Sequence, residues 1–291
     1  MKHVHIMCIA SDHIYTEVID AMTSYFIRRG YRVTQQYPFK IEPNKELFSY
    51  DINIVIKAQH FFNPKQLPKS SLKILFQSEQ FEKLRQFESM PHFESWDLIL
   101  DVFQDNVLRI AKVAIPTVRF FPIGYDKAYD ANPYKTFLHD ERCNLDCYFF
   151  GARTNHRVHL WNKYVLAVVA NARLANQDIG PVKYSNIIHS KINIFMSAWE
   201  PYFVPTMHIM QILANRKFLI VVSETPQNYY PYKNNKHFMV VKPSELKDII
   251  KTGLKSPLLR EIFVEQKMWP DLINNHRFED YFQEALKGFI E

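Results

Sequence analysis

The sequence is poor in glycine. It holds six glycines among 291 residues, and neither G-x-G-x-x-G nor G-x-x-x-x-G-K-[ST] occurs in it. Such glycine-rich turns allow the backbone to approach a bound phosphate closely. Their lack argues against a dinucleotide-dependent enzyme and against a P-loop kinase.

Cysteine is scarce as well. The three cysteines are Cys8, Cys143 and Cys147, an odd number without any C-x-x-C pair. The spacing Cys143-x-x-x-Cys147 has no matching second pair, so we expect no bound metal. A chain of this length without a disulfide pattern is typical of a reducing compartment.

Long hydrophobic runs are missing too. No stretch of about 18 apolar residues could cross a membrane, and the apolar run at 4–10 is too short for a secretion signal and predicts a strand instead. We therefore expect a cytoplasmic protein without a transmembrane segment. The net charge of +6 and the pI of about 9.0 suit nucleotide diphosphates, nucleic acid or peripheral contact with an anionic membrane, and do not distinguish them.

The composition is that of a folded α/β protein with room for two domains. Hydrophobic residues make up 47% and charged residues 23%, which excludes a disordered chain. Short apolar runs separated by helical or polar spacers predict parallel strands in the first half. These runs are 4–10, 31–34, 52–56, 73–77 and 96–100, with an amphipathic helix at 16–29. We predict a first domain at 1–125, a polar, proline-containing linker at 126–144 and a second domain at 145–291, whose final helices pack back.

The second half contains a β-α-β pattern. An apolar run at 191–197 is followed by a loop, a helical pattern at 206–215 and a second apolar run at 218–222. This order predicts two parallel strands joined by a right-handed crossover. Thr206 is a candidate helix cap, and the loop before it carries Glu200 at a strand's carboxyl end, where open α/β sheets bind ligands.

Two arginines follow an earlier strand of this half. The run 147–150 ends at Gly151, and Arg153 and Arg157 come within the next six residues. Glycine permits close backbone approach, and arginine binds phosphate oxygens in a bidentate manner. The pattern predicts a diphosphate site.

The segment from about 145 to 282 resembles the donor half of GT-B glycosyltransferases, closest to the group 1 type of CgeB-like spore-maturation proteins. The motifs that carry this resemblance are Lys-Ile-x-Ile at 191–194, the glutamate loop and helix, Phe-Leu-Ile-Val-Val-Ser at 218–223 and the strand ending in Phe-x-Gly at 149–151. Fainter similarities in the first half are Gln-x-Glu at 77–79 and Pro-x-Gly at 122–124. The interval between the helix after Gly151 and residue 191 looks too short for a complete set of strands.

The resemblance implies an α/β fold of two Rossmann-like domains of the GT-B type, with a trimmed second domain. It implies a hexosyltransferase-like enzyme that moves a sugar from a UDP- or GDP-linked donor to a glycan, lipid, protein or nucleic acid. The metal-binding DxD motif does not occur, so we expect no metal and no cofactor besides the donor substrate. Fixed cations and a helix N-terminus must then stabilise the leaving diphosphate.

The resemblance also assigns candidate site residues. Glu200 is the candidate catalytic carboxylate, and Glu79 is the candidate on the acceptor side. The second acid of the glutamate motif is replaced by His208. The remaining donor-binding candidates are Gly151, Arg153, Arg157, Lys191, Thr206 and Gln211.

Two departures from the family leave alternatives open. The acidic residue that binds the donor ribose is replaced by His208 or Gln211, and Arg216 stands where the helix usually ends in glycine. The chain could therefore bind nucleotides without turnover. Because it is basic, it could alternatively be a nucleic-acid-modifying glycosyltransferase. The stereochemistry of transfer stays undecided.

Overall fold

The computed structural model describes residues 1–8, 15–36, 50–56, 63–78, 93–110, 117–176, 178–197, 206–224 and 229–290. The chain divides into two compact units. Unit 1 comprises Met1–Ile123 and Phe278–Glu291, and unit 2 comprises Gly124–Arg277. Among the residues that the structure describes, no helix is long and apolar enough to cross a bilayer.

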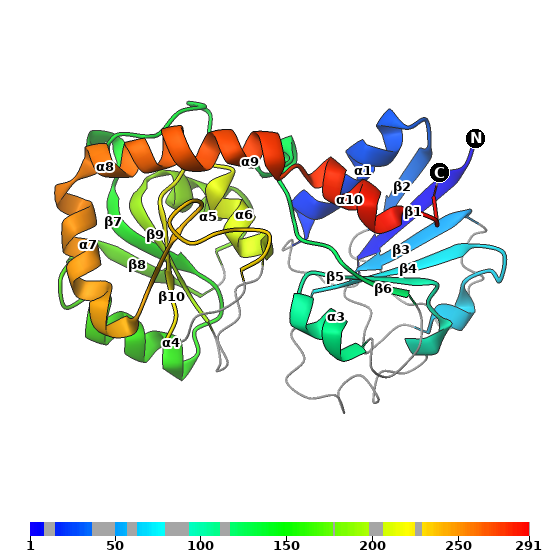
Figure 1. Cartoon of the computed structure of the whole chain (residues 1–291), viewed down its shortest axis with the longest axis horizontal. Coiled ribbons are helices and arrows are strands. Elements are labelled where there is room, and N and C mark those ends of the chain that lie inside the picture. The colour runs from blue at the N-terminus through cyan, green and yellow to red at the C-terminus, as the bar shows by residue number, and fades with distance from the viewer. Residues whose placement is uncertain are drawn as a thin grey trace. The chain divides into compact units, whose positions relative to one another are not determined.

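Unit 1 is built on a six-stranded parallel sheet with the order β2-β1-β3-β4-β5-β6 (Figure 1). The strands are β1 (His3–Cys8), β2 (Arg32–Gln36), β3 (Ile52–Ile56), β4 (Leu72–Gln77), β5 (Leu98–Asp101) and β6 (Thr117–Phe120). Its helices are α1 (Thr16–Arg28), α3 (Gln104–Ile110) and α10 (Phe278–Leu286), with short 3-10 turns η1 (Pro64–Gln66) and η2 (Phe93–Ser95). All five residues of β3 are buried, as expected for a strand covered on both faces.

The C-terminal helix α10 belongs to the core of unit 1. The Phe282 ring contacts the rings of Tyr25, Phe26 and Phe121 at centroid distances of 4.8, 5.7 and 5.2 Å. The contacts with Tyr25 and Phe26 are edge-to-face, and aromatic pairs of this kind add to the apolar burial. On the rim, Glu279 pairs with Arg29 at 2.9 Å.

Unit 2 contains a five-stranded parallel sheet with the order β11-β10-β9-β7-β8. The strands are β7 (Leu145–Phe150), β8 (Ala172–Ala175), β9 (Ser190–Met196), β10 (Leu219–Val222) and β11 (Met239–Val241). The helices are α4 (Asn155–Leu160), α5 (Gly180–Ile188), α6 (Thr206–Leu213), α7 (Leu246–Lys255), α8 (Pro257–Ile262) and α9 (Trp269–Asn275). Two π-helical stretches, η5 (Trp161–Val165) and η7 (Phe263–Met268), continue α4 and α8. The 3-10 turns are η3 (Lys127–Tyr129), η4 (Asp140–Arg142) and η6 (Pro243–Glu245).

The predicted β-α-β pattern of the second half is confirmed. Strands β9 and β10 pair in parallel, with Leu219 opposite Asn193, and α6 connects them along the chain. Thr206, predicted to cap this helix, is instead its first residue. The interval expected to be too short for a complete set of strands contains both β8 and α5.

The long C-terminal helical run does not break at Pro270. Helices α8, η7 and α9 follow one another without a gap, and Pro270 lies in the first turn of α9. A proline in a continuing α-helix would remove a hydrogen bond and clash with the preceding turn. The wider π-helical turn directly before it accommodates the ring.

Candidate functional site

The carboxyl ends of β7 and β9 hold a buried guanidinium. The Arg157 side chain, 7% exposed, donates from Nε to the carbonyl of Met196 and from Nη1 to the carbonyl of Ala152, both at 2.9 Å. Its guanidinium also lies over the Phe149 ring, 5.0 Å from the centroid. Arg157 therefore bridges the last residue of β9 and the turn that follows β7.

Burial lowers the pKa of Arg157 to about 10. No carboxylate among the described residues lies within ion-pair distance of it. An uncompensated buried cation is costly, so this position favours an anion. Two of the five guanidinium N–H donors are used by backbone carbonyls, which leaves three for a ligand.

Gly151 makes room for this guanidinium. Its φ is +138°, and a Cβ added to it would lie 3.2 Å from Phe149 Cζ and 3.3 Å from Arg157 Nη1. The next element, α4, is capped by Thr154, whose Oγ1 accepts from the backbone N–H of Arg157 at 3.3 Å. Only glycine fits both the backbone conformation and the space.

A second buried cation, Lys183 of α5, lies beside the same strand end. Its side chain is 4% exposed, and Nζ lies 6.0 Å from the centroid of the Phe150 ring. Neither α5 nor Lys183 was predicted from the sequence. The Gly180-Pro181 pair that starts the helix was the signal that could have revealed it.

His208 on α6 stacks against the same phenylalanine. The two ring centroids are 5.3 Å apart, with 21° between the ring planes. Burial, reinforced by the charges of Arg157 and Lys183, lowers the pKa of His208 to about 3. Its Nδ1 is buried, and no described residue lies within hydrogen-bond distance of it. His208 is therefore neutral at physiological pH.

Thr206 and Gln211 accompany His208 on α6. Both side chains are buried, with 4% and 2% exposed. Gln211 lies three residues after His208, on the adjoining part of the helix face. The structure thus brings three of the predicted donor-site residues to one strand end: Gly151 follows β7, Arg157 lies on α4 and His208 lies on α6.

Arg153 and Lys191 make contacts with other groups. Arg153 donates from Nη2 to the carbonyl of Leu174 in β8 at 2.7 Å. Lys191 pairs with Asp146 at 2.8 Å near the amino end of β9, about 16 Å from Met196 at the other end of that strand. Its cation is neutralised by a carboxylate at the opposite edge of the sheet. The two predicted catalytic residues, Glu79 and Glu200, lie outside the described residues.

Arg216 follows α6 in an unusual backbone conformation. It has φ +54°, the left-handed conformation that glycine adopts without strain. Its side chain pairs with Glu265 at 3.1 Å and lies over the Trp269 ring, 4.1 Å from the centroid. These contacts stabilise a non-glycine residue in that conformation.

Unit 2 also contains a cluster of His237, Asp271 and His276, whose ligand atoms lie within 4.8 Å of one another. His237 Nδ1 accepts from the backbone N–H of Lys233 at 2.9 Å, so its Nε2 carries the proton and donates to Asp271 at 2.8 Å. That proton occupies the position a metal ion would need. The geometry therefore indicates a hydrogen-bond cluster rather than a metal centre.

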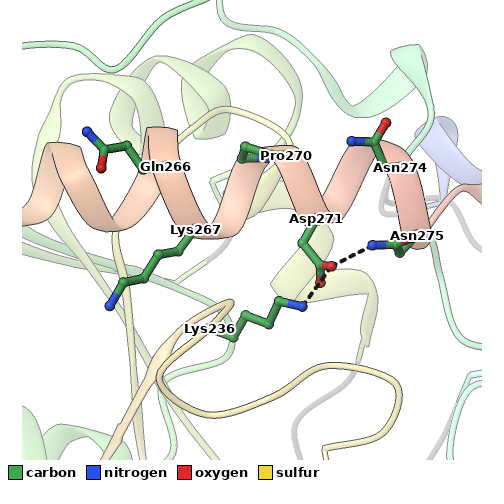
Figure 2. A pocket seen from close by; sticks show the side chains of 7 residues that line it. All are labelled: Lys236, Gln266, Lys267, Pro270, Asp271, Asn274 and Asn275. Carbon is green, nitrogen blue, oxygen red and sulfur yellow. Dashed lines mark hydrogen bonds and ion pairs between the residues drawn. The ribbon is translucent and has the colours of Figure 1, made fainter.

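Asp271 contacts both histidines of this cluster and two further side chains. Figure 2 shows its Oδ1 with Lys236 and Asn275, at 2.7 and 2.6 Å, while Oδ2 faces the two histidines. Burial alone would raise the pKa of Asp271, but these partners lower it below its ordinary value. The carboxylate borders a surface pocket of about 410 Å³, lined by Lys236, Gln266, Lys267, Pro270, Asp271, Asn274 and Asn275.

Solved structures share the fold of this chain, with its two units that each contain a parallel sheet. An α-glucosyltransferase in complex with UDP and a 13-mer DNA superposes with a TM-score of 0.64, at 10% identity, covering 99% of this chain and 100% of that one. A UDP-forming α,α-trehalose-phosphate synthase from Burkholderia xenovorans gives 0.56, at 10% identity and 99% coverage of both chains. The lipopolysaccharide outer core galactosyltransferase WaaB gives 0.55, at 10% identity, covering 98% of this chain and 99% of that one.

No protein-family model matches the sequence, and no curated protein matches it. The structural comparison nevertheless confirms the predicted fold class. The chain has the two Rossmann-like domains of GT-B glycosyltransferases.

Proposed function

We propose that this chain is a glycosyltransferase that moves a hexosyl group from a nucleotide diphosphate sugar to an acceptor. The observation that carries the proposal is the buried, uncompensated guanidinium of Arg157 at the carboxyl ends of β7 and β9. Ligands of open α/β sheets bind at that edge. A diphosphate there would supply the missing negative charge.

The chemistry that we assign to these residues is stabilisation of the leaving group. As the glycosidic bond breaks, negative charge grows on the terminal phosphate of the donor, and fixed cations lower the energy of that state. Arg157 and Lys183 are the two buried cations in position, which is compatible with transfer without a metal. Glu200 stays the proposed catalytic carboxylate, and Glu79 the proposed acceptor-side group.

His208 and Gln211 are our candidates for the ribose hydroxyls. Each offers a neutral acceptor in place of the family's carboxylate, and His208 Nδ1 is buried without a partner among the described residues. We propose UDP as the first nucleotide to test, because two of the similar structures are described with it. GDP is the second. Membership of the CgeB-like type remains part of the proposal.

A second candidate function is a glycosyltransferase whose acceptor is nucleic acid. It is favoured by the similarity to a glucosyltransferase bound to DNA and by the net charge of +6. Binding that depends on phosphate contacts weakens steeply with salt. A DNA affinity that falls at least tenfold between 50 and 200 mM salt, together with transfer of labelled sugar to DNA, would support this acceptor.

The test of donor binding is thermal unfolding with UDP, GDP and their sugars. A nucleotide at about a hundred times its Kd adds roughly 2.7 kcal/mol of stability. Arg157→Gln and Lys183→Gln should each lose most of that shift, while Lys251→Gln, at an exposed position of α7, should keep it. Unchanged nucleotide shifts in both site variants would refute the assignment of the site.

Turnover is tested separately with labelled UDP-glucose and candidate acceptors. UDP release by the wild type that is lost in Arg157→Gln would support the proposal that the chain is an enzyme. Nucleotide binding that requires Arg157, without release of UDP in any donor and acceptor combination, would favour a binding protein without turnover.

A further inference from the structure

Unit 2 buries a lysine that the proposed transfer reaction does not use. Lys217 lies two residues before the start of β10 and is 0% exposed. Its Nζ lies 3.9 Å from Cys143 Sγ and 5.2 Å from the centroid of the Phe137 ring. No carboxylate in the described part of the chain lies within ion-pair distance of it. A buried ammonium without a counter-ion is costly, so this contact with sulfur needs an explanation.

The environment of Lys217 favours the neutral, nucleophilic form of its amine. Burial lowers the pKa of Lys217 to about 8, so an appreciable fraction is uncharged in mildly alkaline solution. The lone pair of that neutral amine is available to attack an electrophilic atom.

Cys143 is the accessible thiol of the three. It is partly exposed, whereas Cys8 and Cys147 are both 0% exposed. Its Sγ also lies 3.8 Å from the carbonyl oxygen of Leu138. Burial and the charge of Asp140 raise the pKa of Cys143, and the cations of Lys217, Arg260 and Lys191 act in the opposite direction. Oxidation at this sulfur should therefore be slow at neutral pH and faster in alkaline solution.

We propose that Cys143 and Lys217 are an oxidation site at which a peroxide joins the two side chains through a covalent nitrogen–sulfur bond. Hydrogen peroxide first converts the thiol of Cys143 to a sulfenic acid and releases one water. The neutral amine of Lys217 then attacks that sulfur, a second water leaves with the hydroxyl oxygen, and a sulfenamide remains. Overall, sulfur loses two electrons, peroxide gains them, and the protein loses two hydrogens.

The bond would tie together two distant segments of unit 2. Cys143 and Lys217 are 74 residues apart, one just before β7 and the other just before β10. Closing so long a loop restricts the unfolded chain and stabilises the folded one. A thiol reductant reverses the step, because two reductant thiols supply the hydrogens that restore the cysteine and the amine and become a disulfide.

The experiment treats the full chain with hydrogen peroxide at pH 7 and pH 8.5, followed by intact mass and peptide mass spectrometry. We expect a peptide pair joined between Cys143 and Lys217 with the loss of two hydrogens, more of it at pH 8.5. Its formation should raise the melting temperature by several degrees, and dithiothreitol should reverse both changes.

Lys217→Met and Cys143→Ser should each abolish the joined peptide, and Cys147→Ala should retain it. Lys217→Met removes a buried charge and keeps a similar length, so the variant is expected to fold. Cys143 recovered as sulfinic acid, or in a disulfide between two chains, with Lys217 unmodified would overturn the proposal.

Discussion

His208 lies against Phe150 with 5.3 Å between the ring centroids and 21° between the ring planes. The imidazole is thus fixed at the strand end where Arg157 and Lys183 place their charges, and those charges help to lower its pKa to about 3. A carboxylate at this position would pair with either cation. A neutral imidazole adds no negative charge beside these two cations, so a histidine at this position, where the sequence resemblance implies an acid, changes the electrostatics of the site rather than only one hydrogen bond.

His208→Phe should stabilise the empty protein and weaken nucleotide binding. Phenylalanine keeps the stacking on Phe150 and removes a buried nitrogen without a described partner, whose burial costs about 1–3 kcal/mol. If Nδ1 accepts from a ribose hydroxyl, UDP affinity should fall about tenfold, or about 1.4 kcal/mol. Urea unfolding and calorimetric titration measure the two effects.

The matched control for this change is His5→Phe. His5 is also buried, and its Nδ1 also has no described partner, but it lies on β1 of unit 1. Its substitution removes the unpartnered nitrogen and also the side-chain hydrogen bond to Gln36, so its effects on stability should offset each other, and UDP affinity should not change. Equal UDP affinity in the wild type and the His208→Phe protein would remove His208 from the nucleotide site.

Gly151→Ala should damage the same site by displacing Arg157. The φ of +138° strains any side chain, and the added methyl would lie 3.3 Å from Arg157 Nη1. We expect a stability loss of about 1–3 kcal/mol and a fall in UDP affinity of roughly tenfold or more. Gly30→Ala is the control, since Gly30 has φ +78° with no atom within 4 Å of the added Cβ. It should lose stability but keep its UDP affinity.

The sequence predicts the strands and the β9-α6-β10 connection well because their apolar residues are β-branched and continuous. It does not predict β8, because Ala172-Arg173-Leu174-Ala175 contains no β-branched residue, nor the short helix α5. Lys183 is missed for that reason. Lys191 shows a different difficulty, since its residue type suits a phosphate site but its place near the start of β9 puts it at the other edge of the sheet.

The sequence also does not determine which side chains of the site are buried. Arg153 and Arg157 look equivalent in the chain, four residues apart on one loop. Only the packing of Phe149 and the end of β9 separates an exposed arginine from a buried one. The hydrogen-bond cluster around Asp271 is likewise invisible in sequence, because its loop and its helix are 34 residues apart.

Asp271→Asn should destabilise unit 2 by roughly 3 kcal/mol, the range observed when a largely buried charged partner is removed. The carboxylate accepts from Lys236, Asn275 and His237, and an asparagine amide would present N–H groups to some of these donors. Asp248→Asn, at an exposed position of α7, should change stability by less than about 0.5 kcal/mol. Urea unfolding of the two variants beside the wild type is the measurement. Equal midpoints for both variants would show that the cluster contributes little to stability.

Stability should fall as the pH drops from 6.5 to 5. Burial lowers the pKa of His237 and of His5 to about 4, and that of His208 to about 3, against an ordinary value of about 6.5 in the unfolded chain. The unfolded state therefore binds more protons in this interval, and the stability present above pH 6.5 is lost as the pH falls. Each buried histidine contributes a loss of at most about 2 kcal/mol over 1.5 pH units. Urea midpoints across this range measure the slope of stability against pH.

His237→Gln should lower the number of protons taken up on unfolding by up to one and so make this slope shallower. His159→Gln, at an exposed position of α4, should leave the slope unchanged. A slope that His237→Gln does not alter would mean that His237 is not held neutral in the folded protein.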